Sequence, residues 1–186
     1  MSTSSMPRPF DAEPSSYGAQ VVLRPLERGD TASVLEVFAG LGDHSRALRF
    51  LAPKPRLTAA DLRQLTAVDH CDHVALLAAA PHGRPIGVAR FVRDPECPDS
   101  ADVAVAVVDA WQDRGIGTLL AHALVRRALE VGVRRFTMMM APHNEGAVRL
   151  LHRAPGEIER LAIDDETAEF AITFGDPASV SLAQAC

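Results

Sequence analysis

The chain has 186 residues, a length that suits a single domain, and 47% of them are hydrophobic, which is enough for a real core. The formal net charge of -5 argues against non-specific binding of nucleic acid, because that binding relies on a basic surface. The three cysteines, Cys71, Cys97 and Cys186, form neither a CxxC pair nor an even-numbered framework. This cysteine usage favours a reducing compartment over a disulfide-stabilised secreted fold.

The two ends of the chain differ in composition from the middle. Residues 1–19 are rich in serine and proline and lack the apolar central region of a secretory signal, so we expect a tail there. Residues 177–186 are also expected to form a tail, which leaves one domain over residues 20–176. No apolar run approaches the roughly 20 residues that a membrane span needs, so no membrane partner is expected and the predicted location is the cytoplasm.

The first third of the domain predicts one short strand followed by three short helices. The strand begins near Gln20. Asp30 can cap the first helix, which is followed by a second helix ending before two prolines. Thr58 and Asp61 stand three residues apart, a variant of the capping box, and predict the start of the third helix.

The rest of the domain alternates apolar strands with two longer helical patterns. The apolar stripe that begins at Ile116 predicts a helix to Val131, and Asn144 or the residues just before it begin another that runs to Arg153. Strands are predicted around them, at 73–80, 86–94, 101–109, 133–141, 157–164 and 168–175. This order predicts a mixed α/β domain with antiparallel and parallel pairing, not a regular doubly wound sheet.

A glycine turn stands between the strand at 101–109 and the long helix. The first turn of a helix has backbone N–H groups without partners and a dipole that favours anions. Gly115 and Gly117 would let a phosphate approach that backbone, with Thr118 and Arg114 beside it. By itself, GxG fits a tight strand-to-helix turn equally well. The nucleotide P-loop pattern is absent, and the third glycine of the dinucleotide fingerprint would fall at Leu120.

The wider pattern resembles a known family. The segment QDRGIG (112–117) matches the Q/R-x-x-G-x-G/A signature of the GCN5-related N-acetyltransferases (GNAT), and NEGAVRL (144–150) resembles that family's N-x-x-A-x-x-L motif. The resemblance covers about residues 20–174. The segments 49–78 and 85–94 further resemble the catalytic domain of mycobacterial-type protein lysine acetyltransferases regulated by cyclic nucleotides. Only about 20 residues precede the first strand, so we do not expect their nucleotide-binding domain in this chain.

The resemblance implies a fold and a cosubstrate. The fold is the α+β GNAT fold, in which about four or five helices flank a mixed, mostly antiparallel central sheet of six to seven strands. The cosubstrate is acetyl-CoA, with no metal. In such proteins the glycine turn binds the pyrophosphate, and the preceding strand and the motif asparagine lie along the pantetheine arm. Those roles would fall on Val107, Val108, Gln112, Asp113, Arg114, Gly115, Ile116, Gly117, Thr118 and Asn144.

Acetyl transfer to an amine needs a base, because a lysine amine, with a pKa of about 10.4, is mostly protonated at neutral pH. The resemblance places the catalytic carboxylate at Asp102, where the relatives carry a glutamate. A strand-end aspartate facing solvent is the alternative. Many members of the superfamily also have a tyrosine that protonates the leaving thiolate. That position is Leu151, and the only tyrosine of this chain is Tyr17.

The cluster HCDH (70–73) contains ligand types that zinc accepts, but no second cluster completes a site. A junction between a loop and a strand is the favoured interpretation, and no metal is expected.

The predicted function is acetyl transfer from acetyl-CoA to a primary amine, with a protein lysine favoured as acceptor. A small-molecule amine acetyltransferase is one alternative. A non-catalytic acyl-CoA-binding regulatory module is another, which Leu151 and the shorter acid at Asp102 favour modestly. No nucleic acid partner is expected, and a homodimer is left open.

Overall fold

The computed structural model describes residues 21–175, so the tails predicted at 1–19 and 177–186 lie outside the described residues. The elements in chain order are β1 (Val22–Pro25), α1 (Thr31–Ala39), α2 (Asp43–Phe50), α3 (Ala59–Leu65), β2 (His73–Ala79), β3 (Pro85–Arg93), β4 (Ser100–Val107), α4 (Ile116–Glu130), β5 (Arg135–Met140), α5 (Glu145–Leu151), β6 (Glu157–Ile163) and β7 (Ala168–Thr173), with single 3₁₀ turns at Pro81–Gly83 and Asp109–Trp111.

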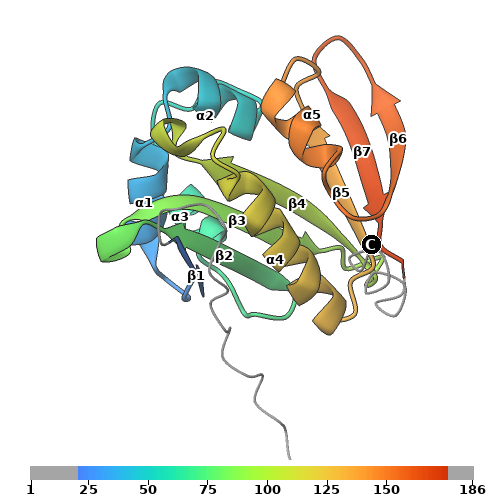
Figure 1. Ribbon diagram of the computed structural model, residues 1–186, viewed down its shortest axis with the longest axis horizontal. Helices are drawn as coiled ribbons and strands as arrows, with labels where there is room; N and C mark the ends of the chain where they lie inside the picture. The colour runs from blue at the N-terminus through green and yellow to red at the C-terminus, as the bar shows by residue number, and fades with distance from the viewer. Residues whose placement is uncertain (1–20, 176–186) are drawn as a thin grey trace, which may run out of the picture.

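The seven strands form one sheet in the order β1-β2-β3-β4-β5-β7-β6, and every neighbouring pair is antiparallel except β4 and β5. Helix α4 packs across β2, β3 and β4, and α1 with α3 covers the other face of the sheet (Figure 1). Two apolar clusters therefore form, one on each face. The predicted mixed, mostly antiparallel sheet of six to seven strands with four or five helices is confirmed.

Local sequence explains where the helices begin. The Asp30 carboxylate accepts a hydrogen bond from the backbone N–H of Ser33 at 3.1 Å and caps α1. Thr58 and Asp61 form the predicted capping box at α3, with both reciprocal hydrogen bonds present. These caps satisfy N–H groups that the first turn of a helix leaves unpaired.

The central feature of the sheet is the divergence of β4 from β5. The two parallel strands pair only between Ser100–Asp102 and Arg135–Thr137. Beyond Asp102 the strands separate, and α2 and α5 lie on opposite sides of the opening (Figure 1). The sheet therefore splits in the middle, and the split leaves one edge of β4 without a strand partner.

Candidate functional site

A cleft of about 780 Å³ occupies the split between β4 and β5. Its floor includes Phe136 and Leu124, and its walls are α2, the N-terminal turn of α4, and α5. Seven of the predicted donor-site residues line this cleft, namely Val107, Gln112, Asp113, Gly115, Gly117, Thr118 and Asn144. Asp102 lines it as well, so the structure brings the predicted base and most of the glycine turn into one cavity.

The unpaired edge of β4 offers backbone groups to the cleft. The N–H of Val108 donates to the carbonyl of Ile86 on β3 at 2.9 Å. Backbone groups of an antiparallel strand alternate in direction from residue to residue. The N–H and C=O groups of Val103, Val105 and Val107 therefore point away from β3, toward the opening, which is where an extended ligand can bond to the strand.

The two predicted pantetheine positions differ in the structure. Val107 lies on the open edge, and its carbonyl accepts a hydrogen bond from Gln112 Nε2 at 3.0 Å. Val108 has both backbone groups engaged, because its carbonyl also accepts from Trp111 N–H at 2.8 Å, and its side chain is buried in the core. The backbone of Val108 therefore faces the sheet and the turn, which differs from the prediction for this residue. The backbone groups on the open edge are those of Val103, Val105 and Val107.

The structure gives different explanations for the presence of glycine at the two positions of the turn. Gly115 has φ +76°, a left-handed conformation that disfavours side chains, and it stands at the N-cap of α4 without a side-chain hydrogen bond. At Gly117 an added Cβ would meet atoms of Leu150 and Val107 only at 3.9 Å, which is an ordinary contact. The fold therefore needs a glycine at position 115 but does not need one at 117, where the missing side chain leaves room beside the helix N-terminus.

The side chains of the turn are only partly directed to the cleft. Gln112 holds the turn to the end of β4 through Val107, and its Nε2 also lies 3.1 Å from Asp109. Arg114 lies over the ring of Trp111 at 5.1 Å and does not line the cleft. Ile116 is buried in the core under α4. The predicted contributions of Arg114 and Ile116 are therefore limited to their backbone groups.

Asn144 marks the opposite wall. Its Oδ1 accepts a hydrogen bond from the N–H of Ala147 at 3.0 Å and caps α5, as the sequence predicted for the start of this helix. No residue between 21 and 175 accepts a hydrogen bond from its NH₂ group. The Asn144 amide is thus held in a fixed orientation beside the cleft, and its NH₂ group can donate hydrogen bonds to a ligand there.

The end of the cleft at Asp102 is charged, and its side chains come from four elements. Asp102 shares its sheet face with Arg90 of β3 and Glu169 of β7, as the strand registers place them, and Arg49 reaches the cleft from α2. Asp102 opens onto the cleft, and its surface is exposed to solvent there. Its restricted hydration, together with the negative Glu169, raises its pKa above the ordinary aspartate value, although the positive charges of Arg49 and Arg90 oppose the rise.

Arg90 and His73 lie next to one another beneath this charged end. Both side chains are buried, the Arg90 guanidinium contacts His73 Nε2, and it donates to the Leu65 carbonyl at 3.0 Å. Burial, with the charge of Arg49, lowers the pKa of Arg90 to about 10. Burial, with the charge of Arg90, lowers the pKa of His73 to about 4, so this histidine is neutral at neutral pH and can accept from the guanidinium.

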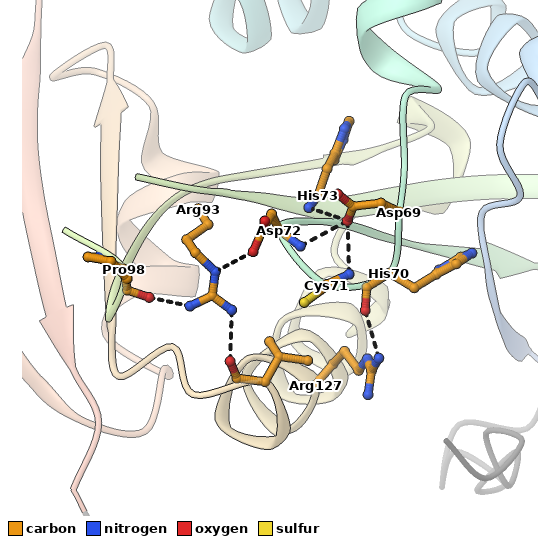
Figure 2. A network of polar contacts seen from close by, with 9 residues as sticks. Asp69, His70, Cys71, Asp72, His73, Arg93, Pro98 and Arg127 are labelled. Atoms are coloured by element: carbon orange, nitrogen blue, oxygen red, sulfur yellow. Dashed lines mark hydrogen bonds and ion pairs between the residues drawn. The ribbon is translucent and has the colours of Figure 1, made fainter. Parts of the chain in front are cut away.

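The HCDH cluster forms the structural junction that was predicted. The Asp69 carboxylate accepts hydrogen bonds from three consecutive backbone N–H groups, those of Cys71, Asp72 and His73, at 2.8 to 2.9 Å (Figure 2). The loop is therefore organised by an internal carboxylate. Across residues 21–175, no group of three or more His, Cys, Asp or Glu side chains is placed to hold a metal ion.

Two arginines connect this junction to the neighbouring elements. Arg93 of β3 bonds to Asp72 at 2.7 Å, to the carbonyl of Pro98, and to the carbonyl of Val131 at the end of α4 (Figure 2). Arg127 of α4 donates to the carbonyl of His70 at 2.7 Å. These contacts fix the C-terminal half of α4 on the sheet, remote from the glycine turn.

Comparison with known proteins identifies the fold. The acetyltransferase (GNAT) family matches residues 43–155, a span that includes the glycine turn, α5 and most of the residues that line the cleft. This chain belongs to the GNAT family. It is also 34% identical over 137 residues to acetyltransferase Pat from Mycolicibacterium smegmatis, an alignment that covers 73% of this chain. The same alignment spans 41% of the length of that Pat protein.

Solved structures agree with this membership. The GNAT domain of S. lividans PAT superposes with a TM-score of 0.76 at 28% identity, covering 84% of this chain and 92% of that domain. A mutant of the cAMP-binding acyltransferase from Mycobacterium smegmatis gives a TM-score of 0.62 at 26% identity, covering 91% of this chain and 48% of the other. AAC(6')-Ib, solved with acetyl-CoA, shares the fold with a TM-score of 0.64 at 21% identity over 89% of this chain and 98% of the other. The predicted kinship with GNAT acetyltransferases of the Pat type, and with it an acetyltransferase enzyme, is confirmed at the level of the family.

The structure also places the position at which a tyrosine acid was looked for. Leu151, the position where many members carry a tyrosine, is buried at the end of α5 and lines the cleft. The only tyrosine, Tyr17, lies outside the described residues. Among the helices of residues 21–175, none has the length and apolar character to cross a membrane.

Sequence reasoning missed Arg49, Arg90 and Glu169. Arg49 and Arg90 lie in the segments that resemble protein lysine acetyltransferases, but that resemblance assigned them no role, and their separations along the chain carry no fixed spacing. Alternation along β3 and β7 shows which face each side chain takes, but only the strand order brings the two strands to either side of Asp102.

Proposed function

We propose that this GNAT domain binds acetyl-CoA in the cleft and transfers the acetyl group to a primary amine that approaches Asp102. The observation that carries the proposal is the continuity of the cleft. One cavity joins a helix N-terminus with space at Gly117, an unpaired strand edge and a carboxylate whose pKa is raised.

The donor half would hold the cosubstrate through backbone groups. The unpaired N–H groups at the start of α4 would bind the pyrophosphate, supported by the helix dipole, since the first turn contains no acidic residue. The free edge at Val103 and Val105 would bond to the amides of the pantetheine arm, and the Asn144 amide would bind beside it. Acetyl-CoA would supply the activated acyl group.

The acceptor half would supply the base. Asp102 would take a proton from the incoming ammonium, directly or through water, because its raised pKa makes it a better proton acceptor than an ordinary aspartate. Arg49 and Arg90 keep the carboxylate ionised against the cost of its restricted hydration. With Leu151 at the tyrosine position, the leaving thiolate would depart without a tyrosine acid.

A protein lysine is the acceptor that the resemblance of residues 49–78 and 85–94 to protein lysine acetyltransferases favours, and this chain is similar to acetyltransferase Pat. The alignment spans less than half of that protein, so its regulation does not follow for this chain. A small-molecule amine acetyltransferase would use the same donor half. The buried Leu151 favours a third candidate, a non-catalytic acyl-CoA-binding module.

The test measures binding and transfer separately. Calorimetry with CoA should give binding to the wild-type protein and at least a tenfold loss for Gly117→Val, with an unchanged melting temperature as the folding control. Labelled acetyl-CoA and a cell lysate then identify the acceptor. Label in proteins supports a lysine acceptor, label in small amines supports the second candidate, and CoA binding without transfer supports the third. Full CoA affinity in folded Gly117→Val would overturn the assignment of the turn.

A further inference from the structure

The glycine turn contains an acidic side chain where the proposed function places a polyanion. Asp113 is the second residue of QDRGIG, has φ +56°, and lines the cleft. A left-handed conformation is uncommon for residues other than glycine, although aspartate tolerates it better than most. Its carboxylate stands two residues before the N-cap of α4, so it would repel a pyrophosphate bound at that helix terminus.

This carboxylate is paired across the cleft. Arg149 of α5 bonds to Asp113 Oδ1 through Nη2 at 3.1 Å, and its Nη1 lies 3.4 Å from Glu145 Oε2. The Arg149 and Asp113 side chains are 50% and 79% exposed, so the pair is in contact with solvent and easily exchanged for another partner. The Asp113–Arg149 ion pair is therefore a contact between the two walls of the cleft, made at the phosphate end.

Arg149 is a cation of the cleft that already bonds to the glycine turn, through Asp113. Arg114, the basic residue of the turn itself, lies over Trp111 and does not line the cleft. Arg149 lines the cleft, already reaches the turn, and carries a guanidinium, which binds phosphate oxygens in pairs. An anion that arrives at the turn meets this guanidinium next to the backbone N–H groups.

We infer that Arg149 is a phosphate-binding residue of the cleft, and that Asp113 is an internal anion that competes with the pyrophosphate of CoA for it. The inference rests on the proposed function. In the free protein the Asp113 carboxylate is bonded to the Arg149 guanidinium. When the pyrophosphate binds, Arg149 bonds to it and α5 stays in contact with the turn through the ligand. The competition lowers the affinity for any CoA species, including the product.

The experiment compares CoA with 3′-dephospho-CoA, which retains the pyrophosphate, by calorimetry on the whole chain. Arg149→Gln should weaken both ligands by about tenfold, since a charge-assisted hydrogen bond is lost. It should also make the salt dependence of the affinity shallower. Asp113→Asn should tighten both ligands severalfold. Arg84→Gln is the matched control, because Arg84 forms a similarly exposed ion pair with Glu36 at 3.5 Å and does not line the cleft.

Three results would overturn the inference: unchanged CoA affinity in Arg149→Gln, a loss confined to CoA and absent with 3′-dephospho-CoA, or weaker binding in Asp113→Asn. The second would move the contact to the 3′-phosphate, and the third would make Asp113 a residue that shapes the turn. Wild-type protein that binds neither ligand would overturn the proposed function itself, and this inference with it.

Discussion

The two halves of the cleft are built on different principles. The proposed donor half consists mainly of backbone: a helix N-terminus, a glycine turn and an unpaired strand edge. The acceptor half consists of side-chain charges from four elements, at Arg49, Arg90, Asp102 and Glu169. The conformation of the glycine turn depends on a short run of sequence, so this part of the donor half can be read as a motif. A charge cluster depends on the packing of distant segments, so it cannot.

The substitution Asp102→Asn should have the largest effect, because it changes the acceptor half and leaves the donor half intact. Removing a general base lowers a rate by about 10² to 10⁴, while the backbone groups that we propose bind CoA are untouched. We expect kcat to fall by that range and the Kd for CoA to stay within twofold, measured by turnover and calorimetry. A fully active variant would remove Asp102 from the chemistry and leave the acceptor half without a base.

The acceptor half should also carry an acid-sensitive part of the stability. The pKa of His73 is about 4 in the folded state and near 6.5 when unfolded. The unfolded chain therefore binds the proton more readily, so this contribution to stability is present above pH 6.5 and is lost as the pH falls toward 4. Chemical denaturation of His73→Gln should show a shallower loss between these values, by about 1 to 3 kcal/mol. If the free energy of unfolding fell equally with pH in the variant and the wild type, the acid-sensitive contribution would not come from His73.

The two glycines of the donor half are expected to differ in role, Gly115 serving the fold and Gly117 serving ligand binding. Gly115→Ala places a side chain at φ +76° and should destabilise the protein by about 1 to 2 kcal/mol. Gly117→Ala lies in the first turn of α4 without a close neighbour, so it should leave the stability unchanged or raise it by up to about 1 kcal/mol, yet weaken CoA binding. Denaturant melts of both variants, beside CoA titrations, check the contrast. Equal destabilisation by the two substitutions would break it.

The smallest expected effects are shifts in the pH dependence of the rate. Arg49→Gln removes a positive charge that favours the ionised Asp102, so the acidic limb of kcat/KM should move to higher pH by up to about one unit. Glu169→Gln removes a negative charge and should move that limb to lower pH. CoA affinity is the control for both. Shifts in the same direction would show that the limb does not report Asp102.

Much of the fold followed from local sequence. The capping residues Asp30, Thr58 and Asn144 begin their helices as predicted. The boundaries were less accurate at helix ends, since α5 ends at Leu151 and not at Arg153. The strand pairing that opens the sheet had no local signal, because β4 has the same apolar alternation whether or not β5 accompanies it.

By itself, the sequence determined the elements, the family resemblance and the glycine turn, because caps, periodicity and turn conformations depend on neighbours within a few residues. Only the tertiary structure decided that Val107 and not Val108 faces the opening, that Asp113 pairs with Arg149, and that charges from positions 49 to 169 meet at Asp102. These depend on the order of the strands and on where β4 and β5 part, which long-range packing sets.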